Sequence, residues 1–145
     1  MREIIPSEVS KLRECLTALA EHHNQVSVNF KGSYPKTPIE QTLKIFEDDI
    51  LQKGSRIAVI EYNDKIVGFC KADIKGDLGI IEYLVVLESY RGQGYGAELM
   101  NWAMKTFESA NTRNIEVKVA DGNNAVTLYE KYGFKMNAHI LKLYR

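Results

Sequence analysis

Three glycines at alternate positions, Gly92, Gly94 and Gly96, stand between an apolar run and a helical pattern. The run, Ile80 to Leu87, is mostly apolar and branched, which is typical of a buried strand. After the third glycine, apolar residues recur at helical spacing as far as Ala110. Glycines let a backbone approach a ligand closely, and a helix start offers free N–H groups and partial positive charge. The segment therefore predicts an anion site, and the expected anion is a pyrophosphate.

Two phosphate-binding motifs fit this segment poorly. The P-loop needs Gly-Lys-Ser/Thr after its glycines, whereas Gly96 is followed by alanine and glutamate. The dinucleotide fingerprint G-x-G-x-x-G/A is matched by Gly92, Gly94 and Ala97, and Glu116 stands near the distance at which that fold places an acid. In that fold, however, the first glycine ends the strand, and a full dinucleotide domain needs more chain than this position leaves. A dinucleotide-binding oxidoreductase is therefore the weakest hypothesis that remains.

A third motif fits better. Arg91-x-x-Gly94-x-Gly96 resembles the Q/R-x-x-G-x-G/A signature of the GCN5-related N-acetyltransferases, the GNAT family. A later segment, Leu128-Tyr129-Glu130-Lys131-Tyr132-Gly133-Phe134, resembles the family's L-Y-E-K-x-G-F segment. The two motifs occur in the family's order and at a plausible spacing, which is more specific than either alone. The resemblance covers residues 80–134, whereas the first 50 residues carry no family signature.

The predicted elements alternate between strands and helices, so the fold class is α/β with a mixed sheet flanked by helices. The resemblance implies the GNAT fold, in which the central strand and the strand at 113–119 splay apart and leave a slot for the pantetheine arm. The pattern predicts strands at 2–5, 56–62, 65–75, 80–87, 113–119, 134–136 and 139–144, and helices at 8–22, 38–52, 97–110 and 125–132.

The resemblance implies that acetyl-CoA is a cosubstrate and that no metal takes part. In the family pattern, pyrophosphate contacts come from the backbone of Gly92, Gln93, Gly94, Tyr95, Gly96 and Ala97. Pantetheine and acetyl contacts come from Leu84, Val85 and Val86. Arg91 opens the motif, and its side chain is expected to help hold the loop. Family members often carry an asparagine where this chain has Gly122. The corresponding contact with the cofactor is therefore predicted at Asn124, with Asn123 as the alternative.

Acetyl transfer from a thioester to an amine needs a base, because a lysine-like ammonium, with a pKa of about 10.4, is no nucleophile. Glu82 is the best candidate, since it interrupts an otherwise apolar strand and a buried carboxylate needs a reason. Some family members carry an acid here, and others carry it two residues earlier, where this chain has Ile80. The alternative roles of Glu82 are an amine anchor or a structural acid. Glu116 is a weaker candidate for the base.

The departing thiolate benefits from an acid, because a thiol has a pKa of about 8.5. The resemblance gives this role to Tyr129, which matches a tyrosine that many family members place near the thioester sulfur. The alternative is a core aromatic beside Tyr132 and Phe134.

Length and composition limit the other possibilities. The 145 residues predict one domain over 1–145. Lys plus Arg and Asp plus Glu both number 19, so the formal net charge is zero, which argues against a nucleic-acid or membrane partner. No apolar run has spanning length, and the N-terminus has no signal-peptide core. Cys15 and Cys70 lack the C-x-x-C spacing of a redox or metal site, which favours a reducing, cytoplasmic setting.

We therefore predict an acetyl-CoA-dependent N-acetyltransferase that acetylates a primary amine of a small molecule or peptide. Direct attack is expected, without a covalent acetyl-enzyme, because both cysteines lie off the motifs. The alternative is a non-catalytic acyl-CoA-binding or sensing module on the same fold. The resemblance also allows a homodimer, since dimers built through terminal strands are common in the family.

The sequence leaves the acceptor open. By resemblance, its site would be built by the first two helices, the irregular segment 25–38 and the region around His139. Phe30 and Tyr34 could form an aromatic wall there, and the acidic run 47–49 could attract a cation. Each of these features more often serves packing or a solvated surface.

Overall fold

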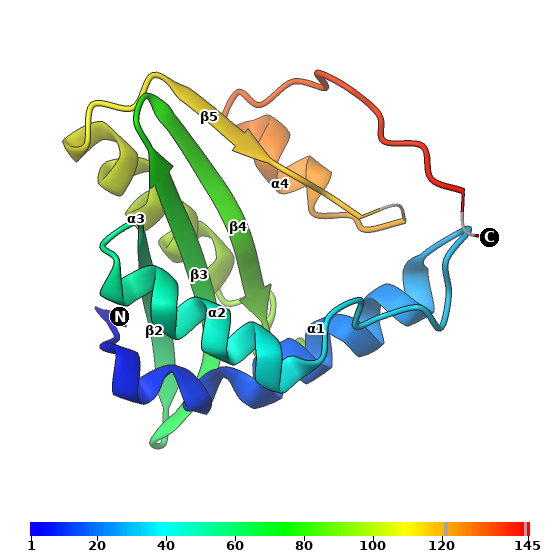
Figure 1. Cartoon of the computed structure of the whole chain (residues 1–145), viewed down its shortest axis with the longest axis horizontal. Helices are drawn as coiled ribbons and strands as arrows, with labels where there is room; N and C mark the ends of the chain where they lie inside the picture. Colours follow the sequence, from blue (N-terminus) through cyan, green and yellow to red (C-terminus); the bar gives the residue numbers. More distant parts are fainter. Residues whose placement is uncertain (121, 144) are drawn as a thin grey trace.

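A five-stranded mixed sheet forms the centre of the computed structural model, which describes residues 1–120, 122–143 and 145 (Figure 1). The strands follow one another in chain order across the sheet. Neighbours pair antiparallel, except for the last two strands, which are parallel. The strands are β1 (Arg2–Glu3), β2 (Ser55–Tyr62), β3 (Lys65–Lys75), β4 (Leu78–Val86) and β5 (Asn114–Val117).

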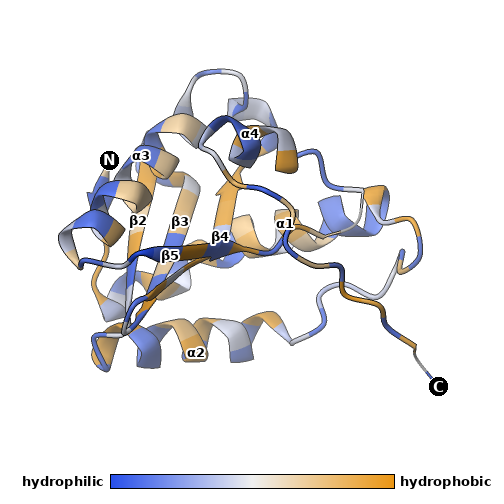
Figure 2. Ribbon diagram, turned by 90° about the horizontal axis from the view of Figure 1, so that it is seen from above, coloured by the Kyte–Doolittle hydropathy of each residue, from blue (hydrophilic) through white to orange (hydrophobic). Residues whose placement is uncertain are grey.

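Helices cover both faces of the sheet, with α1 and α2 on one side and α3 and α4 on the other (Figures 1 and 2). The α-helices are α1 (Arg13–Val26), α2 (Ile39–Leu51), α3 (Tyr95–Ser109) and α4 (Val126–Lys131), and two 3₁₀ turns are η1 (Pro6–Leu12) and η2 (Glu88–Tyr90). This arrangement confirms the predicted α/β class with a mixed sheet. Among the described helices, none combines the length and apolar character needed to cross a membrane.

Apolar side chains fill the space on each face of the sheet. On the α2 side, Phe46 packs edge-on against Phe69 of β3, with ring centroids 6.2 Å apart. On the other side, Leu99 and Phe107 of α3 are fully buried. A Cβ added to Gly79 of β4 would lie 2.5 Å from the Phe107 ring, so only glycine lets α3 pack this closely against β4.

Two irregularities of β4 shape the functional region. Lys71 of β3 pairs with Tyr83, but the next residue of β3 pairs with Ile81, so Glu82 is the additional residue of a β-bulge. On its other edge, β4 pairs with β5 only as far as Ile81 and Val117. Beyond that point β4 continues to Val86 without β5, which is the expected splay between the two strands.

Several predicted boundaries need correction. The first helix was predicted at 8–22, but the chain forms a 3₁₀ turn to Leu12 and an α-helix that continues to Val26. The predicted terminal strands at 134–136 and 139–144 are wrong, because residues 134–143 form no strand, and Tyr144 lies outside the described residues. Leu141 and Leu143 in this segment are 94% and 79% exposed. Their apolar pattern resembles a strand, but a strand also needs an edge to pair with.

Candidate active site

A cleft of about 360 Å³ opens where β4 ends and the glycine loop begins. Its wall combines three stretches that are distant in the sequence: one face of α1, the end of β4 with the loop into α3, and the connection from β5 into α4. The lining residues are Ala18, Leu19, His22, Val26, Leu84, Val85, Val86, Tyr90, Arg91, Gly92, Gly94, Tyr95, Gly96, Gly122, Asn123, Asn124, Ala125 and Leu128.

The glycine loop presents a helix start to this cleft. Gly92 and Gly94 have φ values of +78° and +86°, a left-handed conformation in which glycine is strongly favoured. Gly94 is the N-cap of α3, and no side chain caps the helix, so the first N–H groups of α3 have no partner inside it. The Arg91 Nε donates a hydrogen bond to the Val86 carbonyl at 3.0 Å, which ties the loop to the end of β4. A helix start of this kind can receive an anion.

Most residues predicted to contact the cofactor line the cleft. They are Leu84, Val85, Val86, Arg91, Gly92, Gly94, Tyr95, Gly96 and Asn124. Gln93 and Ala97 do not, since both are exposed outside its wall. The Ala97 carbonyl instead accepts a hydrogen bond from the Tyr132 hydroxyl at 3.4 Å.

Helix α1 contributes a wall that the sequence analysis missed. The first helix was predicted to end at His22, but α1 continues to Val26. His22 and Val26 both line the cleft. Burial lowers the pKa of His22, and the positive charge of Arg91 lowers it further. Leu19 and His22 are three residues apart and therefore share a helix face. That spacing was the signal available in the sequence.

The connection between β5 and α4 closes the cleft against α1. A Cβ on Gly122 would lie 1.9 Å from the Val26 carbonyl oxygen, so this contact excludes any larger residue. The Asn123 Oδ1 accepts a hydrogen bond from the Ala125 backbone N–H at 2.9 Å, and its amide lies 3.4 Å from Nε2 of His23. Asn123 and Asn124 both line the cleft, so either can reach a ligand there.

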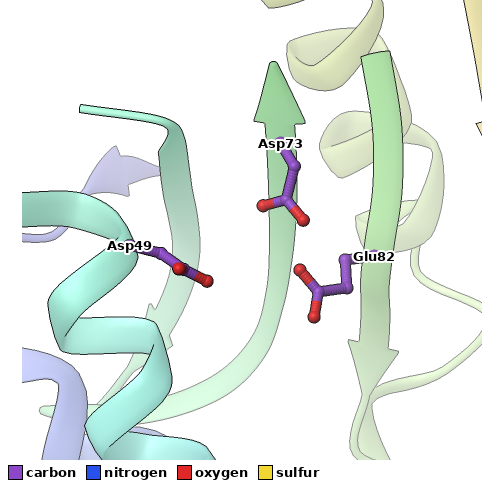
Figure 3. Close-up of side chains that lie close together, drawn as sticks. All are labelled: Asp49, Asp73 and Glu82. Carbon is purple, nitrogen blue, oxygen red and sulfur yellow. The ribbon is translucent and has the colours of Figure 1, made fainter. Parts of the chain in front are cut away.

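Three carboxylates converge on the α2 side of the sheet. Asp49 comes from α2, Asp73 from β3 and Glu82 from the bulge of β4 (Figure 3). Their oxygens lie within 4.8 Å of one another, as in a metal site. The cation among them, however, is the ammonium of Lys71, which lies 2.8 Å from Asp49, 2.7 Å from Asp73 and 2.5 Å from Glu82.

The protonation states in this cluster differ between neighbours. Burial raises the pKa of Glu82 to about 7, the proximity of Asp73 acts in the same direction, and Lys71 opposes both. Burial also acts to raise the pKa of Asp73, but hydrogen bonds with Glu82, Lys71 and Ser55 outweigh it and lower that pKa. Neighbouring carboxyls whose pKa values are pushed apart are a common basis for acid and base roles.

Glu82 differs from its predicted environment in one respect. It was expected to be buried, but its side chain is 35% exposed. Glu82 is the additional residue of the bulge and has no partner in the β3–β4 ladder. Glu82 is therefore open to solvent and to a ligand on one side, and held by Lys71 on the other. Neither Glu82 nor Glu116 belongs to the cleft wall.

Tyr129 lies on α4 beside Leu128, which lines the cleft. Only 6% of Tyr129 is exposed, and its ring packs edge-on against Phe134 at a centroid distance of 6.0 Å. Burial raises the pKa of Tyr129 to about 12, with a smaller contribution from Cys70. The phenol therefore stays protonated at neutral pH, as a proton donor must.

The comparisons with known proteins agree with this geometry. The sequence model of the acetyltransferase (GNAT) family matches residues 16–134. The PaiA N-acetyltransferase of Thermoplasma acidophilum, solved with coenzyme A, is similar with a TM-score of 0.77 and 15% identity, over 94% of this chain and 89% of that one. No curated protein sequence gives a significant match.

Two further solved structures extend the likeness over nearly the whole chain. An acetyltransferase of Trypanosoma brucei has a TM-score of 0.72 and 22% identity, over 99% of this chain and 97% of that one. The aminoglycoside N-acetyltransferase AAC(6')-Iy, bound to the bisubstrate analogue CoA-S-monomethyl-acetylneamine, has a TM-score of 0.71 and 15% identity, over 99% and 95%. At these identities the structures share the fold.

Proposed function

This chain belongs to the GNAT family of acetyltransferases, and from that membership we propose an acetyl-CoA-dependent N-acetyltransferase that acts on a primary amine of a small molecule or peptide. One observation carries the proposal most: the uncapped start of α3 and its two left-handed glycines open onto the cleft beside the splayed end of β4. The pyrophosphate would bind the loop backbone, and Leu84 to Val86 would contact the pantetheine arm. Two of the similar structures were solved with coenzyme A or a CoA analogue, which supports this class of cosubstrate.

The proposed reaction uses groups on both faces of the sheet. Glu82, with a pKa of about 7, takes a proton from the acceptor ammonium, and the neutral amine attacks the thioester carbonyl. Backbone N–H groups of β4 beyond Ile81, where β5 no longer pairs, are available to stabilise the oxyanion. The carbon–sulfur bond then breaks, and Tyr129 protonates the departing thiolate. The nitrogen gives up its second proton as the amide forms, and this proton restores the phenol of Tyr129.

The state of the two cysteines supports direct transfer. Cys15 and Cys70 are both buried and unpaired, and burial raises the pKa of each thiol to about 12. A thiol that stays protonated at neutral pH is a poor nucleophile. We therefore propose that the acetyl group passes to the amine without residing on cysteine.

The acid role predicts a specific effect of Tyr129→Phe. Loss of the phenol proton is expected to lower kcat for CoA release by about 100-fold, with little change in the Kd of acetyl-CoA. Tyr132→Phe is the matched control, because Tyr132 lies at the same helix end but its exposed hydroxyl bonds to Asn101 at 3.0 Å. Steady-state kinetics and a binding titration measure the two quantities. Equal kcat values for the two variants would assign Tyr129 to the core only.

The glycine loop is tested by thermal unfolding with acetyl-CoA, with NADH and ATP as comparisons. Acetyl-CoA alone is expected to stabilise the chain, by about 2.7 kcal/mol at a hundred times its Kd. Gly94→Ala should raise the Kd about tenfold, because αL strain costs about 1–2 kcal/mol and the new Cβ would crowd the anion site. Gly76→Ala is the matched control: Gly76 also has a positive φ of +61° and open space around it, but lies in the β3–β4 turn.

The outcomes separate the proposed enzyme from its alternatives. Binding of acetyl-CoA together with amine-dependent release of CoA would support the transferase. Binding without release across a library of amines would favour a non-catalytic acyl-CoA-binding module. A preference for NADH over acetyl-CoA would contradict the proposal.

A further inference from the structure

Lys71 is a lysine in the interior of the sheet, with a side chain that is 0% exposed. Lysine is almost never fully buried unless it is paired, and a methionine or leucine at this place in β3 would pack without a charge. Its ammonium donates hydrogen bonds to Asp49, Asp73 and Glu82, and it also lies 3.3 Å from the Ser55 hydroxyl. Burial opposes the charged form, but these hydrogen bonds outweigh it and raise the pKa of Lys71. Lys71 is therefore a permanent buried cation.

The partners of Lys71 differ in their access to solvent. Asp73 is held inside the protein: its side chain is 9% exposed, and it also accepts a hydrogen bond from the Ser55 hydroxyl at 2.5 Å. Glu82 and Asp49 have side chains that are each 35% exposed. Lys71 thus joins an inner carboxylate to two outer ones, and one of the outer two stands on the bulge.

The bulge places the Glu82 side chain on the same face of the sheet as Lys71, Asp49 and Asp73. In a regular strand consecutive side chains point to opposite faces. Here Glu82 contacts Lys71, and the next residue, Tyr83, packs against Phe46 of α2 at a centroid distance of 5.0 Å. Both side chains therefore lie on the α2 side. On that side the groups that face Glu82 are Lys71 and Asp73 of β3, Asp49 of α2 and the phenol of Tyr83.

We propose that Lys71 is a positioning residue for the acceptor reaction: its buried ammonium fixes the Glu82 carboxylate at the bulge, while Asp73 offsets the positive charge that would otherwise suppress proton uptake there. This inference rests on the proposed N-acetyltransferase function. Three carboxylates surround one ammonium, so a proton that arrives at Glu82 relieves negative charge. With Lys71 but without Asp73, Glu82 would be a weak base. With Asp73 but without Lys71, the Glu82 carboxylate would have no fixed orientation.

Two substitutions should move the titration of Glu82 in opposite directions. Lys71→Met removes a cation and should raise the midpoint, whereas Asp73→Asn removes an anion and should lower it, each by about one to three pH units. The midpoint is measured on the full chain by carboxyl ¹³C NMR, with Glu82→Gln to assign the signal. Lys44→Met is the control, because Lys44 is an exposed lysine of α2 paired with Asp48 at 3.2 Å, and it should cause no shift.

A kinetic readout connects the titration to the reaction. The pH at which kcat/KM for amine-dependent CoA release reaches half its plateau should follow the NMR midpoint in each variant. The inference would be overturned if the Glu82 midpoint shifted in the same direction in both variants, or in neither. It would also be overturned if the pH dependence of kcat/KM did not follow the NMR midpoint. Should Lys71→Met not fold, Asp73→Asn still decides, because it leaves Lys71 paired with Glu82 and Asp49.

The two proposals fail in different ways. Absence of CoA release from the unaltered protein, with every amine tried, contradicts the proposed function and with it the kinetic role of Lys71. CoA release that occurs with an unshifted Glu82 midpoint in Lys71→Met and Asp73→Asn contradicts only the inference about Lys71.

Discussion

Glu82→Gln is expected to lower kcat/KM for amine-dependent CoA release by about 10²–10⁴-fold near neutral pH. Glutamine keeps the size and polarity of the side chain, but its amide cannot take a proton from the acceptor. The bulge geometry and the glycine loop do not depend on this charge, so the Kd of acetyl-CoA should stay within about twofold. Steady-state kinetics and a binding titration check the two expectations together.

The pH profile gives this prediction a sign. Glu82 accepts a proton only when it is ionised, and burial places its pKa at about 7. For the unaltered protein, kcat/KM should therefore rise as the pH increases through about 7 and then level off. Glu82→Gln should lose that rise. A variant that keeps both the rate and the rise would show that the base is another group.

Glu116→Gln is the matched control for this experiment. Glu116 lies in β5 opposite Ile80 of β4 and is exposed to solvent, and it was the weaker candidate for the base. Its substitution should leave the rate within about twofold. A large loss in Glu116→Gln together with normal activity in Glu82→Gln would exchange the two assignments.

Lys71→Met is expected to destabilise the fold more than any other substitution considered for this chain. Breaking a buried ion pair by removing one partner costs about 3–5 kcal/mol, because a buried charge is left uncompensated. In this protein that charge is mainly Asp73, whose side chain is 9% exposed. Domains of this size are stable by only about 5–15 kcal/mol, so the variant should unfold at much lower urea concentration.

A double variant separates this charge effect from packing. Lys71→Met combined with Asp73→Asn removes the cation and the inner anion together, so it should recover part of the lost stability. Lys44→Met removes an exposed ammonium from a surface pair and should change the free energy of unfolding by about 0.5 kcal/mol or less. Urea unfolding followed by circular dichroism measures all three variants. A Lys71→Met protein as stable as Lys44→Met would mean that water already compensates Asp73.

The glycine loop could be predicted from the sequence because its constraints are local. Gly92 and Gly94 adopt positive φ, and few other residues do so without strain. The turn at Asn63 and Asp64 was predictable for the same reason, since both have positive φ in the β2–β3 hairpin. The order of strands and helices follows from apolar periodicity, which needs only neighbours along the chain.

The acidic cluster and the α1 wall could not be predicted in this way, because each depends on contacts between distant segments. Lys71 belongs to no motif of the sequence, and its partners come from α2 and β4 as well as β3. The end of α1 packs closely against Gly122, about a hundred positions later in the chain. The terminal strands failed for the same reason, since a strand exists only where an edge pairs with it.

The bulge at Glu82 also makes the length of β4 matter, in addition to its composition. Upstream of it, Gly79 and Ile81 hold the register with β5, and downstream of it, Leu84 to Val86 reach the cleft. Deleting this single residue would restore regular pairing, since Ile81 and Tyr83 already pair with consecutive residues of β3, but it would remove the carboxylate that Lys71 holds. Insertions and deletions are usually tolerated in loops and avoided in strands. In this strand we expect evolution to have kept the residue count as strictly as the residue types, because the additional residue is the one that carries the Glu82 carboxylate.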